Sequence, residues 1–594
     1  MNSNRIIQLK KYINLLNSTQ KKYFYLITIA QIALIILDLI FVAFMGVLGS
    51  LLTSYISQQP VGNRVLWLLS LLSIGTNSLR LQLIYLLGIC VISILARMLF
   101  SIYLQKIAFS FLSKVSTELT YKVYRSYGDS RAIKSTKFTQ QEIITATLDN
   151  INTLVTNFFG SLTFLFADLT LTIVILISLL FIDSLSTILI LCIFLFLGFT
   201  IYKFTKKSSR ILGAKQTNLI IQMRENITIL LRQFRELKVM NYTKNIQRNF
   251  WKLSEEYYRI IAQTRVLPGI NRYLWEFSSI LILFTIGIVQ FSMYESTRAI
   301  GNLAIFLGAS LRLLPAAVRI QNSIFTFKMS MSQGELAIKL LDETNRYSDS
   351  FSTRFTNSTE GKTLDFVPVV SVEKLSYRYP DQQSNVLDDI DLNIKSGQFV
   401  GIMGESGVGK STLMDLILGI IEPTTGTISI SYVNPNVVFE LWPQKVAYVS
   451  QNTYIAPGSL RENLLFGVPN NLISDDILIQ TLNKAHLGDF LNAQKDGLDT
   501  KLSEEGNSIS GGQRQRIGIA RALVFNPKLI IFDEVTNSLD MDTETQIAKL
   551  FDELKGESSL LVISHSPETL KYADVIYLLK NGKLIEKFND KFEN

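Results

Sequence analysis

Apolar residues are distributed unevenly and divide the chain into two halves. Of the 594 residues, 48% are hydrophobic, and the excess lies mainly before residue 325. A membrane-spanning helix needs about 20 mostly apolar residues. Six stretches meet this requirement, and they cover residues 23–52, 81–104, 155–182, 185–204, 270–294 and 300–325. The pattern therefore predicts an all-α transmembrane domain over residues 1–340 with six spans.

The connections between these stretches predict how the helices continue beyond a bilayer. A tight turn at Asp183-Ser184 joins the third and fourth stretches. The gap between the second and third stretches, and that between the fourth and fifth, are long and contain few Gly or Pro. We expect paired helical rods with turning points near 135–141 and 232–244. Separate soluble domains in the gaps are the alternative, which the lack of strand signals and turn clusters disfavours.

Ionisable residues interrupt the apolar stretches. A charge at bilayer depth is costly and usually faces the bundle interior or a wet cavity. Two interpretations remain open: these side chains line a substrate path, with Glu276 and Arg312 the foremost candidates, or they pair between helices. Pro315 should kink or weaken the sixth span, because proline removes a backbone donor. The five charged residues are Asp38, Arg97, Asp168, Glu276 and Arg312.

Basic residues beside the apolar stretches predict an orientation. Lysines at 10, 11, 21 and 22 precede the first span, and cationic flanks of this kind lie on the cytoplasmic side. They offer an explanation for the net charge of +9 that needs no nucleic-acid partner. The first apolar run is too long for the core of a signal peptide. Cys90 and Cys192 both lie in apolar runs and are interpreted as core thiols.

The second half carries a phosphate-binding loop. We predict a polar linker over 341–365 and a soluble domain over 366–594. The apolar run 399–403 leads into a G-x-x-x-x-G-K-S loop, whose backbone N–H groups wrap the phosphates of a nucleotide. The lysine reaches the β and γ oxygens and the last serine takes a Mg²⁺ position. The loop consists of Gly404, Glu405, Ser406, Gly407, Val408, Gly409, Lys410 and Ser411.

Two further motifs accompany this loop. The run 529–532 reads as a buried parallel strand, and it ends in Asp533, which can hold Mg²⁺, and Glu534, which can polarise an attacking water. A glycine pair opens a second helix and exposes the positive end of its dipole. That motif is Ser510, Gly511, Gly512 and Gln513.

Together these motifs resemble those of ATP-binding cassette (ABC) proteins. The resemblance implies that the 510–513 signature of one domain caps the ATP held by another, so this single cassette would work as a homodimer or with a homologous half-transporter. It implies a Mg²⁺-sensing role for Gln451 and a γ-phosphate contact for His565. The remaining nucleotide-binding residues that it implies are Tyr379, which would stack on adenine, Thr412 and Asp540.

Six spans followed by a cassette resemble a bacterial ABC exporter half-transporter. The fold implied is an all-α six-helix transmembrane domain followed by an α/β P-loop ATPase domain. The function implied is ATP-driven, Mg²⁺-dependent export or flipping of an amphipathic substrate across the inner membrane by alternating access, with the ATPase domain cytoplasmic. Lipid-linked oligosaccharide or glycolipid is the preferred substrate, because segments 272–276 and 311–315 resemble the flippase subgroup. Peptides, drugs and other lipids remain open, as do an ATP-gated channel and a non-transport ABC ATPase.

Overall fold

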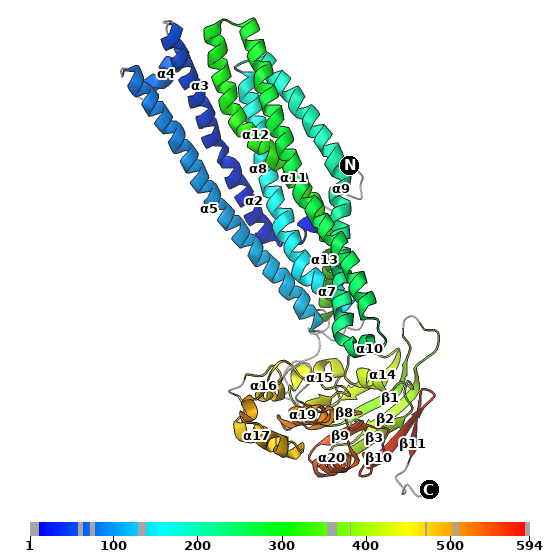
Figure 1. The fold of residues 1–594 in the computed structure, drawn as a ribbon. Helices are drawn as coiled ribbons and strands as arrows, with labels where there is room; N and C mark the ends of the chain where they lie inside the picture. Colours follow the sequence, from blue (N-terminus) through cyan, green and yellow to red (C-terminus); the bar gives the residue numbers. More distant parts are fainter. Residues whose placement is uncertain are drawn as a thin grey trace. The chain divides into compact units, whose positions relative to one another are not determined.

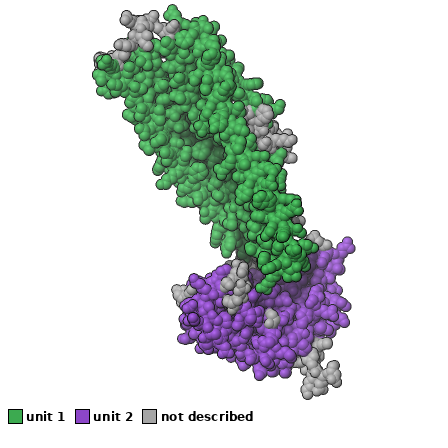
Figure 2. Space-filling view, viewed as in Figure 1, with its two compact units in different colours: residues 1–128, 136–352 green, residues 129–135, 353–594 purple. Residues whose placement is uncertain are grey.

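A computed structural model of the chain consists of two compact units (Figures 1 and 2). One comprises residues 1–128 and 136–352, and the other residues 129–135 and 353–594. The structure describes residues 11–57, 63–71, 78–128, 138–352, 365–379, 382–469, 472–502, 509–537 and 539–587.

The first unit is helical throughout the part that the structure describes. Its π-helical segments η1 (Ala146–Asn150) and η2 (Thr153–Phe159) connect α7 to α8. The α-helices are α2 (Ser18–Ala33), α3 (Ile35–Ser57), α4 (Asn63–Leu71), α5 (Leu79–Tyr127), α7 (Gln140–Thr145), α8 (Gly160–Leu180), α9 (Ser184–Arg232), α10 (Phe234–Val239), α11 (Thr243–Met293), α12 (Ser296–Gln333) and α13 (Glu335–Ser352).

Apolar composition and length set five stretches of this unit apart. Among the described residues, 18–54, 80–127, 140–180, 243–293 and 299–333 are long and apolar enough to cross a membrane, and 184–200 is a shorter apolar stretch. The first, second and sixth predicted spans fall within these stretches, the third and fifth end two residues and one residue beyond them, and the fourth runs beyond residue 200. The exact span boundaries stay a prediction. The first predicted span is divided at Leu34, where α2 ends and α3 begins.

Helices α5, α9 and α11 contain 49, 49 and 51 residues, far more than the roughly 20 needed to cross a bilayer. The rods predicted for the long gaps are therefore continuous with the spans. One predicted turning point agrees with the structure, since α9 ends at Arg232 and α11 begins at Thr243. The other, near 135–141, lies partly outside the described residues. Pro315 was expected to kink or weaken the sixth span, and α12 runs through it without a break.

Helix α12 lies at the centre of the unit, where α3, α8, α9 and α11 pack against it (Figure 1). The approach of α3 is close, because a Cβ at Gly49 would lie 2.3 Å from the Cβ of Ala304. A buried polar network joins the α8–α9 turn to α11 and α12. There Asp183 accepts from Ser186 Oγ at 2.6 Å and from Gln290, which in turn accepts from Asn302 Nδ2 at 2.9 Å.

The first part of the predicted linker over 341–365 is helical, because α13 continues to Ser352; the domain boundaries stay a prediction. The reason is burial: Ala337, Leu340 and Leu341 lie in a core cluster with residues of α5 and η2. These buried apolar residues stabilise the helix, which continues through the polar residues that follow them. Residues 353–364, the middle of the predicted linker, lie outside the described residues.

The second unit is built on a six-stranded sheet in the order β11-β10-β3-β9-β8-β5, in which β10, β3, β9, β8 and β5 are parallel. A three-stranded antiparallel sheet has the order β2-β1-β4, and β6 pairs with β7. The strands are β1 (Val370–Tyr377), β2 (Leu387–Ile394), β3 (Phe399–Gly404), β4 (Thr425–Ile430), β5 (Val446–Val449), β6 (Gly458–Ser459), β7 (Lys501–Leu502), β8 (Leu529–Asp533), β9 (Ser559–Ile563), β10 (Val575–Lys580) and β11 (Lys583–Lys587).

The buried apolar residues of this unit form two core clusters, and β8 contributes alternate residues to each of them. Residues 529–532 of β8 are buried, as predicted for a strand covered on both faces. Because β3, β8 and β9 are parallel neighbours, their carboxyl ends meet at one edge of the sheet. The helices are α14 (Lys410–Ile417), α15 (Pro435–Leu441), α16 (Leu460–Leu465), α17 (Asp475–Lys484), α18 (Gly488–Asn492), α19 (Gly511–Leu523) and α20 (Met541–Leu554), with the short η4 (Gly497–Asp499).

Candidate nucleotide site

The loop between β3 and α14 has the backbone of a phosphate-binding loop. Gly407 and Gly409 have φ angles of 82° and 111°, a region that residues with a Cβ rarely adopt. Lys410 starts α14, and its Nζ donates to the carbonyl oxygens of Gly404 at 2.7 Å and Glu405 at 3.2 Å. The lysine is thus held over the loop whose N–H groups would receive the phosphates.

Three of the predicted site residues contact the carboxylate of Glu534. Its Oε1 lies 3.3 Å from Lys410 Nζ and 3.0 Å from His565 Nε2. Its Oε2 accepts from Gln451 Nε2 at 2.7 Å. These residues follow four different strands, β3, β5, β8 and β9. The sheet order therefore brings together four side chains that the sequence places up to 155 positions apart.

The backbone at Glu534 is strained. Its φ is 49°, and a non-glycine residue held in the left-handed region costs on the order of 1–3 kcal/mol. Its N–H donates to the carbonyl oxygen of Ile563 at 2.9 Å, which fixes this conformation. Asn537 Nδ2 also donates to Glu534 Oε2 at 2.8 Å. Sequence reasoning gave Asn537 no role, although it lies three positions after the carboxylate.

Asp533 has a neighbour that the sequence did not reveal. Tyr448 of β5 donates its hydroxyl to Asp533 Oδ2 at 3.1 Å. Burial raises the pKa of Asp533 above its ordinary value. Burial, and secondly the Asp533 carboxylate, raises the pKa of Tyr448, so the phenol stays a donor at neutral pH. The sequence signal was position alone: Tyr448 lies three residues before Gln451, on the strand beside β8.

Tyr379 lies near the first turn of α14. Its hydroxyl is 3.1 Å from Thr412 Oγ1, and its ring packs edge-on against Tyr377 at 5.0 Å between centroids. The side chain is partly exposed, as a residue that stacks on a base must be. The structure thus connects two predicted nucleotide-binding residues, and stacking on adenine stays a prediction.

The signature motif forms the start of α19. Ser510 Oγ accepts from the N–H of Gln513 at 3.1 Å, and Gln513 Oε1 accepts from the N–H of Ser510 at 2.9 Å. This reciprocal cap leaves Gly511 and Gly512 in the first turn. Helix α19 packs against α16, α17 and β5, whereas α14 packs against β4. Within the described residues, no hydrogen bond or ion pair joins the motif to Lys410 or Glu534.

Asp540 also lies apart from the Glu534 cluster. It caps α20, where its carboxylate accepts from the N–H of Thr543 at 3.1 Å and from the Thr543 hydroxyl at 2.8 Å. These hydrogen bonds lower the pKa of Asp540. Its contribution to nucleotide binding stays a prediction.

The oxygen donors expected for Mg²⁺ fit that ion. Ser411 supplies an exposed hydroxyl at the start of α14, Asp533 a carboxylate, and Gln451 an amide oxygen, since the amide nitrogen is bound to Glu534. Hard oxygen ligands of this kind, completed by phosphates and water, suit Mg²⁺. Occupancy by Mg²⁺ and nucleotide stays a prediction.

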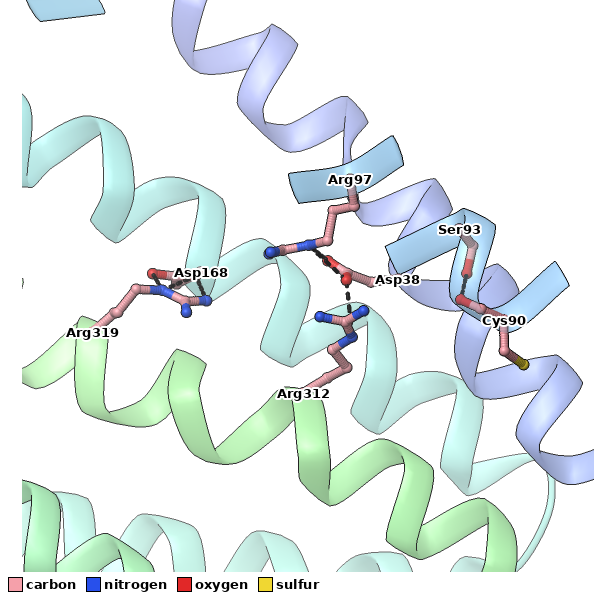
Figure 3. Close-up of polar contacts among 7 residues, drawn as sticks. All are labelled: Asp38, Cys90, Ser93, Arg97, Asp168, Arg312 and Arg319. Atoms are coloured by element: carbon pink, nitrogen blue, oxygen red, sulfur yellow. Dashed lines mark hydrogen bonds and ion pairs between the residues drawn. The ribbon is translucent and has the colours of Figure 1, made fainter. Parts of the chain in front are cut away.

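The charged residues of the helical unit form ion pairs (Figure 3). Asp38 binds Arg97 Nε at 2.7 Å and Arg312 Nε at 3.1 Å. Glu276, by contrast, pairs with Arg272 of its own helix at 2.7 Å. The two foremost path candidates are therefore in different settings, and Arg312 takes part in the helix-to-helix pairing that was the alternative interpretation.

Asp168 has a partner that the sequence analysis missed. Arg319 Nη2 donates to its Oδ1 at 2.7 Å and Arg319 Nε to its Oδ2 at 2.9 Å. The available signal was spacing, because Arg319 follows Arg312 by two helical turns and so shares its face. A role of these residues in a substrate path stays a prediction.

Comparison with known proteins gives a family match within the second unit and relatives that align with more than half of the chain. Residues 387–537 match the family described as ABC transporter. A multidrug resistance ABC transporter ATP-binding and permease protein of Lactococcus lactis subsp. lactis (strain IL1403) is 32% identical over 359 residues, which are 60% of this chain and 58% of the relative. A probable ABC transporter ATP-binding/permease protein of Haemophilus influenzae is 28% identical over 402 residues, covering 66% of this chain and 70% of the relative.

A solved structure shares the fold over almost the entire length. The structure of a bacterial Atm1-family ABC exporter with ATP bound has a TM-score of 0.70 and 17% identity, and the match covers 95% of each chain. At this identity the likeness concerns the fold. The predicted fold class is confirmed: a helical domain with several apolar helices, of the kind found in multi-pass membrane proteins, is followed by an α/β ABC ATPase domain.

Proposed function

We propose that the chain is one half of a dimeric exporter that couples ATP hydrolysis to the movement of an amphipathic substrate across a membrane. The observation that carries this proposal is the convergence of Lys410, Gln451 and His565 on the Glu534 carboxylate. The cluster lies in a domain that follows several apolar helices in the same chain.

The residues divide the chemistry of hydrolysis among them. Mg²⁺ would supply charge neutralisation between the phosphates, held by Ser411, Gln451 and Asp533. Lys410 exchanges its contacts with Glu534 and the loop carbonyls for phosphate oxygens. The freed Glu534 accepts a proton from a water molecule, as a general base does, and His565 remains beside it to contact the γ-phosphate.

The cluster is incomplete without a second cassette. The reciprocal cap with Gln513 holds Ser510 at the N-terminus of α19. Among the described residues, no hydrogen bond or ion pair joins Ser510 to Lys410 or Glu534. In the dimer, the helix tip of one copy would complete the phosphate site of the other. Closure of two such sites by nucleotide, and its release on hydrolysis, would drive alternating access, because nucleotide favours the closed arrangement.

The substrate is proposed as a class. The name of the L. lactis relative refers to multidrug resistance, which favours amphipathic small molecules. Lipid-linked oligosaccharide or glycolipid remains a candidate from segments 272–276 and 311–315, and peptides a further one. We propose an inner-membrane location with the N-terminus and the ATPase domain in the cytoplasm. An ATP-gated channel would need no vanadate-sensitive, substrate-stimulated turnover, so that measurement in proteoliposomes separates pump from channel.

Crosslinking tests the sandwich of two cassettes directly. We would introduce Ser406→Cys and Ser510→Cys together in a Cys192→Ser background, because Cys192 is exposed whereas Cys90 is buried. Nucleotide should make a short bifunctional crosslinker join two subunits. The matched control pairs Ser406→Cys with Asp552→Cys on the exposed side of α20 and should yield no crosslinked subunits. Absence of crosslinking by the first pair in the presence of nucleotide would refute the dimeric site.

A further inference from the structure

A polar cavity of about 430 Å³ lies within the helical unit. It is lined by residues of α2, α3, α5, α8 and α12. Its apolar lining includes Ile35, Phe109 and Leu171. Four charged side chains and two amides also line it, and they are Gln31, Asp38, Arg97, Gln105, Asp168 and Arg319.

The charges around this cavity do not balance. Asp38 is 1% exposed and is shared between the guanidinium groups of Arg97 and Arg312 (Figure 3). Asp168 is matched by Arg319 alone. Three arginines therefore surround two carboxylates, and the excess positive charge comes from Arg312, which lies outside the cavity lining. Positive charge without a partner is costly among apolar helices, so an anion in the cavity would be favoured.

Some hydrogen-bond donors around the cavity also lack an acceptor among the described residues. Arg97 binds Asp38 through Nε, and its Nη1 and Nη2 make no hydrogen bond to another described residue. Gln31 is 7% exposed, and its buried Nε2 has no hydrogen-bond partner among the described residues. Arg312 lies over the ring of Phe41 at 4.8 Å and supports Asp38 from outside the cavity lining. The excess at this site is thus in donors as well as in positive charge.

We propose that this cavity binds the anionic head of an amphiphile, a phosphate or carboxylate group attached to an apolar chain. The Nη groups of Arg97 match the oxygen spacing of such anions, and Gln31 adds a donor. The apolar lining takes the first part of the chain. This inference rests on the proposed export function, since it names the substrate class and disfavours cationic amphiphiles.

Binding to the full chain in a neutral sugar detergent, without nucleotide, tests the site. The probes are octyl phosphate, octanoate, inorganic phosphate and octyltrimethylammonium. Octyl phosphate should bind saturably, and octanoate with it. Arg97→Gln should weaken octyl phosphate binding by about tenfold or more, the effect of losing a charged hydrogen bond. Arg259→Gln, which removes an exposed arginine on α11, should leave binding unchanged.

A variant that should bind more tightly is included, because weaker binding could also result from misfolding. Asp168→Asn releases the guanidinium of Arg319, so octyl phosphate should bind more tightly than to the wild type. Equal binding of octyl phosphate by Arg97→Gln and wild type overturns the site. If octyltrimethylammonium binds as tightly as octyl phosphate, the proposed preference for anions is wrong. If inorganic phosphate binds as tightly as octyl phosphate, the proposed preference for an amphiphile is wrong.

The two proposals fail separately. Binding is measured without ATP, so octyl phosphate binding that depends on Arg97, together with absent vanadate-sensitive transport, would overturn export alone. Transport that persists without such binding would overturn this site alone.

Discussion

The Glu534 cluster of the second unit and the Asp38 cluster of the first unit both place one carboxylate between two basic side chains. Glu534 lies between Lys410 and His565, and Asp38 lies between Arg97 and Arg312. The first is on loops at the end of a sheet, where a nucleotide can take the place of a contact. The second is inside a helix bundle, where loss of the carboxylate leaves two guanidinium groups without their counter-charge. The comparison predicts that the same arrangement serves chemistry in one unit and stability in the other.

Glu534→Gln should separate the two roles most sharply. The amide keeps the size and the contact with Gln451 but cannot accept a proton, so ATP turnover should fall by about 10²-fold or more. The unfolding temperature should change little. Steady-state hydrolysis of the purified chain measures the first and a thermal melt the second. Glu553→Gln, on the exposed side of α20, is the control, and undiminished hydrolysis by Glu534→Gln would contradict the assignment of the base.

Asp38→Asn should have the opposite profile. It leaves the guanidinium groups of Arg97 and Arg312, which are 23% and 16% exposed, without their counter-charge. Removing one partner of a buried pair costs about 3 kcal/mol, measurable as a lower unfolding temperature in detergent. Asp342→Asn breaks the exposed pair with Lys11 and should have no measurable effect. An unchanged melt for Asp38→Asn would mean that the cluster is hydrated and replaceable, as the nucleotide cluster is.

A pair of helix caps extends the comparison within the second unit. Ser510 and Ser459 both cap a helix reciprocally, with Gln513 and Glu462. Alanine at either position should cost about 1 kcal/mol of unfolding free energy. ATP turnover should fall only with Ser510→Ala, because only that helix tip is proposed to meet a nucleotide. Equal losses of turnover in both variants would reduce the signature serine to a structural cap.

The smallest effect concerns the pH dependence of stability. Because burial raises the pKa of Asp533, its carboxylate is less favourable in the folded chain than in the unfolded one. This penalty is present above the folded pKa and is relieved as pH falls through it. Nucleotide-free Asp533→Asn should therefore melt slightly above wild type at neutral pH, with a difference that shrinks on acidification. Asp552→Asn, exposed on α20, should show no such trend. If the difference in unfolding temperature between Asp533→Asn and wild type grew in acid, the stated direction of the pKa shift would be wrong.

The nucleotide site was largely predictable because its parts are short motifs. The loop ending in Lys410 and the pair Asp533-Glu534 each follow an apolar strand directly, and neighbouring parallel strands deliver their ends to one edge. The contact between Tyr448 and Asp533 was not predictable, since it spans 85 positions and depends on β5 lying beside β8. Sequence spacing does not encode strand order.

The helical unit was predictable as a set of apolar helices and not as a set of contacts. Hydropathy indicated where the apolar stretches lie, but Asp168 and Arg319 are 151 positions apart, and their pairing depends on which helix faces meet. The break between α2 and α3 at Leu34 was not predictable, because neither glycine nor proline lies beside it. The extension of α13 to Ser352 depends on tertiary burial of Leu340 and Leu341. This burial was not predictable from the polar composition of the residues that follow.

The position of His565 has a consequence for observing this molecule at work. Its Nε2 lies 2.7 Å from Lys410 Nζ and 3.0 Å from Glu534 Oε1. One ring nitrogen either accepts from the ammonium or donates to the carboxylate, so the imidazole must adopt one tautomer or the other. The chain contains only two histidines, and His486 lies in a separate loop. Nitrogen-15 labelling of histidine would thus give a spectrum of two imidazoles, of which His565 reports on the contacts of Lys410 and Glu534.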